Sequence, residues 1–162
     1  MEIELTQDRI EFLEKDYRRG FVKFCGFQAS KIDKGLFEST LTIGENHKTQ
    51  DNFIHAGVIA TMSDHTAGYA AYTLVPHDMR ILTIEFKINF LKPAYGHTLK
   101  CKSEIISQGK QIIVAQSTVF DVRDDHEKMV SKSTITLMAM DAGKLNKKDE
   151  KNEKAPVNFT SL

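Results

Sequence analysis

The sequence of 162 residues has no tryptophan, only two cysteines and three prolines, and no excess of charge of either sign. Its 22 basic residues balance its 22 acidic ones, so no overall field favours binding to nucleic acid or to an anionic membrane. No run approaches the roughly 20 apolar residues that span a bilayer. The first five residues are acidic in character and lack the apolar core of a secretory signal. We therefore expect a soluble, cytoplasmic protein of one domain.

The two cysteines, Cys25 and Cys101, lie far apart, outside any CxxC pair and without a nearby set of histidines. Zinc sites bring several ligands at characteristic spacing, so the pattern does not favour a metal centre. We expect two buried free thiols, no metal and no cofactor.

Hydrophobic periodicity and turn residues divide the chain into an ordered series of elements. Thr6 is a candidate N-cap for a first helix over residues 5–20, which Gly20 could end. Residues 57–74 predict a long helix with many small residues, against which other backbone can pack closely. Alternation and turn signals predict strands over 24–32, 36–43, 83–90, 99–107, 111–122 and 130–140.

Consecutive hairpins imply an antiparallel sheet, and a long helix rich in small residues would lie across its buried face. The expected fold is α+β, with an antiparallel sheet wrapped around a long central helix and an additional N-terminal helix. We assign residues 1–142 to this domain. Residues 143–162 are rich in lysine and poor in apolar side chains, and we expect a flexible charged tail there.

His55, Ala56 and Gly57 stand where the long helix begins. The N–H groups of a first helical turn have no partner within the helix, and glycine lets a ligand approach the backbone. Such a terminus could polarise a thioester carbonyl and hold a developing oxyanion. The alternative is an ordinary helix start after a loop.

Asp64 lies inside this helix among small and apolar residues, so it must be exposed, paired or functional. A carboxylate there could attack a thioester or deprotonate a water molecule. His65 points about 100° away, as packing or surface histidines do. Nine residues separate His55 from Asp64, which places them on nearly opposite sides of the helix. A site that uses both would therefore span two chains. Thr83 begins the polar face of the 83–90 strand and by itself indicates nothing.

Residues 55–71, HAGVIATMSDHTAGYAA, resemble the H-[GA]-G-V-x-A-x-x-x-D motif of the phenylacetate-degradation (PaaI-type) hot-dog thioesterases. Residues 82–94, LTIEFKINFLKPA, resemble the strand that follows the helix in this family, and the hairpin at residues 108–110 fits as well. The resemblance covers roughly residues 20–140.

This resemblance implies a hot-dog fold, acyl-CoA thioesters as substrates, and a homodimer or tetramer with its sites between protomers. It implies Asp64 as nucleophile or general base, and the Gly57 N–H as oxyanion donor with His55 orienting the loop. It also implies that the Thr83 hydroxyl helps to position the attacking water.

One departure from the family concerns the loop before the helix, where Thr49 occupies the place of a frequent asparagine. Gln50 could supply the missing amide to the catalytic site, or Asn52 could contact the substrate, as Ala56 is also expected to do. A hot-dog dehydratase or hydratase is disfavoured, because the resemblance does not extend to the spacing and loop of those sites. A non-catalytic acyl-CoA-binding module is the other alternative, although such a module does not need an acid at Asp64.

Overall fold

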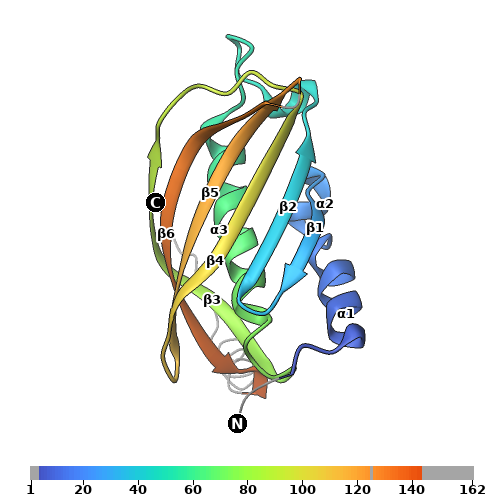
Figure 1. The fold of residues 1–162 in the computed structure, drawn as a ribbon, viewed down its shortest axis with the longest axis vertical. Helices are drawn as coiled ribbons and strands as arrows, with labels where there is room; N and C mark the ends of the chain where they lie inside the picture. The colour runs from blue at the N-terminus through green and yellow to red at the C-terminus, as the bar shows by residue number, and fades with distance from the viewer. Residues whose placement is uncertain (1–3, 125, 144–162) are drawn as a thin grey trace, which may run out of the picture.

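A six-stranded antiparallel sheet curls around one long helix (Figure 1). The computed structural model describes residues 4–124 and 126–143, so the expected charged tail lies outside the described residues apart from Gly143. In chain order the elements are α1 (Gln7–Tyr17), α2 (Phe21–Cys25), β1 (Gln28–Asp33), β2 (Leu36–Thr42), the 3-10 helix η1 (Glu45–His47), α3 (Ala56–Tyr72), β3 (Met79–Phe90), β4 (Thr98–Gln108), β5 (Ile112–Arg123) and β6 (His126–Asp141).

The N-terminal helix α1 begins as its sequence predicts. The Thr6 side chain accepts a hydrogen bond from the Arg9 N–H at 3.3 Å, and Leu13 and Tyr17 are buried. The predicted strand over 24–32 is wrong in its first part, because residues 21–25 form α2 instead. Gly20 (φ 61°) and Gly26 (φ 83°) flank this short helix in backbone conformations that glycine adopts without strain.

The strand order in the sheet is β1-β2-β4-β5-β6-β3. The hairpins β1–β2, β4–β5 and β5–β6 agree with the turn signals. The prediction that successive strands pair as hairpins is wrong for β3. This strand pairs with β6 at the far edge of the sheet, and β4 pairs with β2. The connection between β3 and β4 crosses the end of the fold, where the Asp121 carboxylate accepts hydrogen bonds from the Tyr95 and Gly96 N–H groups at 3.0 and 2.7 Å.

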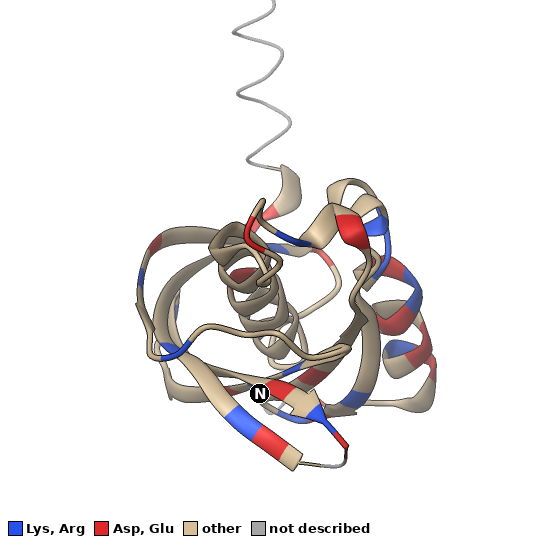
Figure 2. Ribbon diagram, turned by 90° about the horizontal axis from the view of Figure 1, so that it is seen from above, with Lys and Arg blue, Asp and Glu red and all other residues tan. Residues whose placement is uncertain are grey.

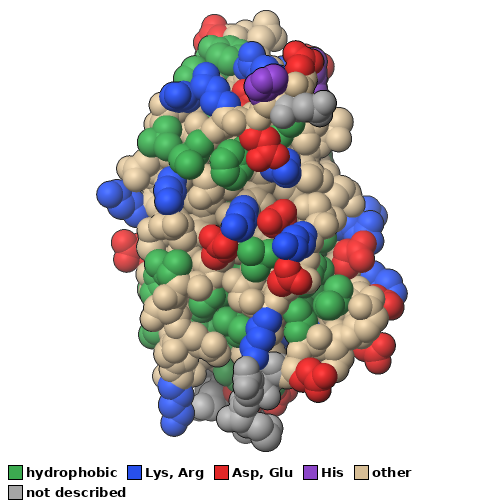
Figure 3. Space-filling model, viewed as in Figure 1, with side chains coloured by type: hydrophobic (Ala, Val, Ile, Leu, Met, Phe, Trp, Pro, Cys, Tyr) green, Lys and Arg blue, Asp and Glu red, His purple; other side chains and the backbone are tan. Residues whose placement is uncertain are grey.

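Helix α3 fills the concave side of the sheet and packs against β2 through β6. Ala67, Ala70 and Ala71 are completely buried, as expected for a helix that lets strands approach closely. Figure 2 shows α3 inside the curl with almost no charge, whereas charged residues line α1. Basic and acidic side chains gather over the middle of the outer face of the sheet (Figure 3). None of the helices in the described ranges is both long and apolar enough to cross a membrane.

A β-bulge at Ile84 changes which side chains of β3 face the helix. Thr83 pairs with the buried Leu137, and Phe86 pairs with the buried Ile135, so Thr83 and Phe86 share the inner face. Uninterrupted alternation predicts Thr83 on the polar face of the strand, opposite the apolar Phe86, and that prediction is wrong. The extra residue shifts the register by one and turns Thr83 towards α3.

Strand β3 is an edge of the sheet, and its outer side has no strand partner within the described chain. Several large apolar side chains on it are exposed, namely Leu82, Ile84, Phe86 and Phe90. A long apolar edge of this kind is suited to pairing with another strand.

Candidate active site

The carboxylate of Asp64, in the middle of α3, contacts the inner face of β3. The Thr83 hydroxyl donates a hydrogen bond to Asp64 Oδ1 at 2.8 Å. The β-bulge makes this contact possible, because it directs the Thr83 side chain towards the helix. In the described part of the chain, the second carboxylate oxygen, Oδ2, accepts no hydrogen bond. One oxygen of Asp64 is thus held in place and the other is available for chemistry.

Asp64 opens onto a cavity of about 280 Å³ between α3 and β3. The cavity is lined by Asp64, His65, Gly68, Tyr69, Tyr72, Ile81 and Thr83. Gly68 lies one turn beyond Asp64, and a side-chain carbon at that position would meet no atom within 4 Å. The small residue therefore leaves open space beside the carboxylate.

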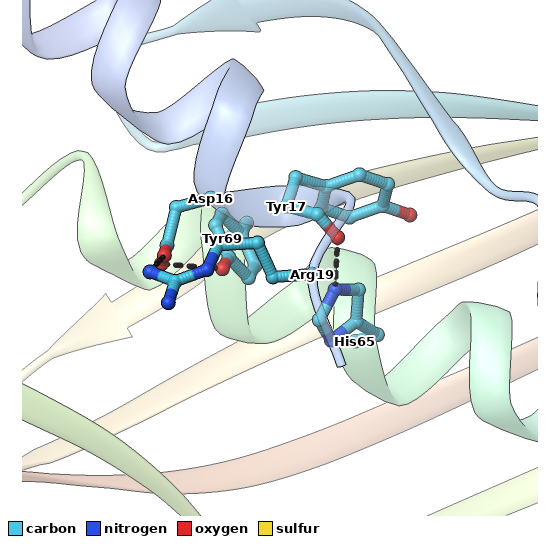
Figure 4. A network of polar contacts seen from close by, with 5 residues as sticks. All are labelled: Asp16, Tyr17, Arg19, His65 and Tyr69. Carbon is cyan, nitrogen blue, oxygen red and sulfur yellow. Dashed lines mark hydrogen bonds and ion pairs between the residues drawn. The ribbon is translucent and has the colours of Figure 1, made fainter. Parts of the chain in front are cut away.

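His65 follows Asp64 in the sequence and is a packing residue, which is one of the two roles that its position on the helix predicted (Figure 4). Its Nε2–H donates to the Tyr17 carbonyl oxygen at 3.0 Å, and its ring contacts the rings of Tyr17 and Tyr69. Burial lowers the pKa of His65 below its ordinary value, because the charged imidazolium is poorly solvated there. His65 is therefore held neutral and serves the packing of α1 on α3.

At the start of α3, His55 caps the helix. His55 Nδ1 accepts a hydrogen bond from the Gly57 N–H at 2.9 Å, and the His55 N–H donates to the His47 carbonyl oxygen at 2.9 Å. The donor expected to hold an oxyanion is thus occupied by the imidazole. A ligand oxygen would have to share this N–H or replace the ring nitrogen.

A second cavity, of about 340 Å³, adjoins His55 and Gly57. Much of its wall is apolar and comes from α2 and α3, and its full lining is Phe21, Phe24, Cys25, Asn46, His47, Lys48, His55, Gly57, Val58 and Thr61. Phe21 and Phe24 are 67% and 77% exposed, so the α2 wall stands open to solvent.

Sequence reasoning missed His47 and Asn46, which lie on the wall of this cavity. His47 is buried; its Nδ1 accepts from the Gly44 N–H at 2.9 Å and its Nε2–H donates to the Cys25 carbonyl oxygen at 2.9 Å. These bonds tie the loop before α3 to α2. No local pattern distinguishes His47 from a surface histidine, because its partners lie on a segment that is not adjacent in sequence.

Gln50 and Asn52 lie exposed at the tip of the loop before α3. The Thr49 N–H donates to the Phe53 carbonyl oxygen at 2.8 Å, which closes the tip, and Asn52 adopts a positive φ of 63°. Neither residue is among those that line the cavity beside His55. Ala56 instead borders a third cavity of about 230 Å³, next to Phe53 and Phe90.

The structure therefore brings the expected site residues together as two separate pairs. Asp64 and Thr83 form one, and His55 and Gly57 form the other, each at its own cavity. The two pairs do not line a common cavity in one chain, in agreement with the angular argument from the helix. Neither thiol is in a disulfide; Cys101 is buried as expected, but Cys25 is half-buried. Among the described residues, no three His, Cys, Asp or Glu side chains cluster as metal ligands.

The family model described as "Thioesterase superfamily" matches residues 51–127. A Saccharolobus solfataricus protein whose name places it provisionally among the esterases is 30% identical over 98 residues. That match covers 60% of this chain and 65% of the relative, so the chain spans slightly less than two thirds of the relative's length.

Solved structures extend the similarity to most of the chain. A thioesterase family protein from Silicibacter pomeroyi is 30% identical, with a TM-score of 0.78 over 82% of this chain and 98% of that protein. The PaaI protein of E. coli, from the phenylacetic acid degradation operon, is 19% identical with a TM-score of 0.73, over 85% and 96% of the two chains. A Streptococcus mutans protein whose structure has acetyl-CoA bound is 22% identical with a TM-score of 0.66, over 76% and 93%.

Proposed function

The chain belongs to the thioesterase superfamily and has the hot-dog fold of the PaaI-type proteins, and from this premise we propose that it hydrolyses acyl-CoA thioesters to a free acid and CoA. The observation that carries the proposal is the Asp64 carboxylate, held at one oxygen by Thr83 and open to a cavity at the other. The acetyl-CoA bound to the Streptococcus mutans neighbour supports a CoA ester as the substrate.

In the proposed reaction Asp64 Oδ2 removes a proton from water, and the resulting hydroxide attacks the thioester carbonyl carbon. The C–S bond then breaks, and the thiolate of CoA takes up the proton. Direct attack by the carboxylate, followed by hydrolysis of the anhydride, uses the same atom as a nucleophile. In both routes Thr83 holds Oδ1 and so directs Oδ2 into the cavity.

The carbonyl oxygen needs a donor as negative charge develops on it. We assign this role to the Gly57 N–H, which the His55 imidazole occupies until the substrate carbonyl displaces or shares it. The amide of Asn46, on the wall of the same cavity, is better placed than Gln50 to contact the substrate. Asn52 and Ala56 remain candidates for contacts with the outer part of the CoA ester.

Because the two pairs lie at separate cavities, we propose that each site combines the His55–Gly57 pair of one protomer with the Asp64–Thr83 pair of its partner. The exposed apolar edge of β3 supports assembly through this strand in a homodimer, which a second contact could double to a tetramer. A monomer at micromolar concentration in light scattering would contradict this assembly.

The test of the proposed function is Asp64→Asn, assayed for thiol release against a panel of aromatic and aliphatic acyl-CoA substrates. The change is nearly isosteric, but an amide is neither an effective base nor an effective nucleophile. We expect kcat to fall to background with little change in KM and no change in the elution volume on gel filtration. Wild-type turnover by a folded Asp64→Asn protein would refute the assignment. Binding of acyl-CoA without turnover by the wild type would favour the binding-module alternative.

The shared site has its own test, in which His55→Ala and Asp64→Asn chains are unfolded together, mixed in equal amounts and refolded. A mixed dimer then holds one site with both changes and one site with neither. Random pairing should restore about a quarter of the wild-type activity, although each variant alone is nearly inactive. Mixed chains that stay as inactive as the separate variants would show that each site is built within one chain.

A further inference from the structure

A third group of polar residues lies outside both pairs, in a cavity of about 400 Å³ between α1, the end of α3 and the start of β3. Arg9 on α1, Arg19 just after it and Arg80 on β3 contribute to its wall, together with Asp16 and His77. Three arginines thus meet one carboxylate here, and the proposed reaction uses none of them.

The Asp16 carboxylate is already satisfied by other partners (Figure 4). Its Oδ1 forms an ion pair with Arg19 Nη1 at 3.1 Å, and its Oδ2 accepts a hydrogen bond from the Tyr69 hydroxyl at 2.8 Å. The carboxylate of Asp16 therefore balances the positive charge of Arg19. Over residues 4–124 and 126–143, neither Arg9 nor Arg80 forms an ion pair with a carboxylate. With three arginines and one carboxylate in its wall, the cavity has an excess of two positive charges.

Arg9 is unusual among the three arginines, because this residue is only 6% exposed. Its Nη1 donates to His77 Nδ1 at 2.9 Å and its Nη2 donates to the Tyr72 carbonyl oxygen at 3.1 Å, while the guanidinium lies 5.4 Å from the centre of the Phe12 ring. A guanidinium has five N–H donors, so these two bonds leave three without an acceptor among the described residues.

Burial lowers the pKa of the Arg9 guanidinium; the attraction of Asp16 opposes this shift, and the repulsion of Arg80 adds to it. An arginine nevertheless stays charged in a protein, so a bound anion would further offset the cost of burying this cation. Arg80 donates only to the His77 and Met79 carbonyl oxygens at 3.2 and 2.9 Å, and its exposed side chain can turn towards an anion in the cavity.

We propose that this cavity binds a phosphoryl group, with Arg9 as the fixed inner ligand and Arg80 as the outer one. A phosphate monoester carries about two negative charges near neutral pH, which matches the excess of two positive charges in the cavity wall. Guanidinium groups bind phosphate oxygens through paired, charge-assisted hydrogen bonds. With Nδ1 accepting from Arg9, His77 carries its proton on Nε2 and offers a further donor. The volume exceeds that of phosphate alone, so an organic group can accompany the phosphoryl group.

The experiment is calorimetric titration of the wild-type protein with inorganic phosphate at constant ionic strength. Arg80→Gln is the informative variant, since Arg9 also ties α1 to α3 and its loss could unfold the chain. Arg18→Gln, at the exposed residue directly after α1, removes the same charge outside the cavity and is the matched control. We expect saturable binding that weakens at least about tenfold in Arg80→Gln and less than about twofold in Arg18→Gln.

No saturable binding of phosphate, equal loss in the two variants, or tighter binding of malonate than of phosphate would overturn the proposal. Titration in the presence of CoA distinguishes the source of the phosphoryl group. Competition identifies a phosphate of CoA itself, and simultaneous binding identifies a separate phosphorylated ligand; both results uphold the site. The measurement requires no turnover, so it stands even if the protein fails to hydrolyse acyl-CoA.

Discussion

The hydrogen bond between Thr83 and Asp64 offers a direct test of how the carboxylate is positioned. Thr83→Val removes the hydroxyl while keeping the shape of a β-branched side chain on the strand. The residue is exposed, so the free energy of unfolding should change by no more than about 0.5 kcal/mol. The effect should fall on catalysis, because Asp64 Oδ1 would lose its only donor among the described residues.

The size of the effect follows from the strength of that bond. A hydrogen bond to a charged group contributes about 1.5–3 kcal/mol. If the whole of this free energy stabilises the transition state by orienting Asp64, kcat should fall about 10- to 150-fold when the hydrogen bond is removed. Thr83→Ser keeps the hydroxyl and should stay within a few-fold of the wild type, which makes it the matched control.

Steady-state kinetics on Thr83→Val, Asp64→Asn and the double variant would show whether Thr83 acts through Asp64. If it does, the Thr83 change should cost little once Asp64 is already asparagine, because the two effects are coupled. Independent, additive losses would refute the reasoning and assign Thr83 a separate contact with water or substrate. Equal rates for Thr83→Val and the wild type would show that the hydrogen bond does not contribute to turnover.

Two further predictions concern stability. Burial lowers the pKa of folded His65 below its ordinary 6.5, so the unfolded chain binds more protons than the folded chain as the pH falls below that value, and the folded state loses stability from about pH 6.5 downwards. Urea unfolding at two pH values should show a smaller loss of stability in His65→Gln than in the wild type. Equal losses in the two proteins would contradict this prediction. Gly96→Ala would place a carbon against the Asp121 carboxylate and 2.6 Å from the Val122 carbonyl oxygen, and should lower the free energy of unfolding by about 1–3 kcal/mol. In Gly68→Ala the added carbon meets no atom within 4 Å, so this variant should stabilise the helix. Thermal unfolding distinguishes the two variants, and equal melting temperatures would contradict the packing argument.

The sequence by itself determined the elements whose signals are local. The small residues of α3 predicted a long buried helix with Asp64 as its one acid, and the structure contains it over Ala56–Tyr72. Thr6 was equally predictable as a cap, because capping depends on residues a few positions apart. The short helix α2 could not be predicted in this way, because five residues are too few to show a helical period of apolar side chains.

The tertiary structure decided everything that depends on segments far apart in the chain. Strand β3 alternates in sequence whether it pairs with β4 or with β6, and the choice of β6 rests on backbone hydrogen bonds that side-chain patterns do not encode. The bulge at Ile84 reverses the face of Thr83 and brings it to Asp64, nineteen residues away, because one extra residue in a strand exchanges its two faces. The sequence does not predict that Arg9 is buried, since an arginine on an amphipathic helix is ordinarily solvated. Only the packing of α1 against α3 encloses it in a cavity that Arg80 also lines.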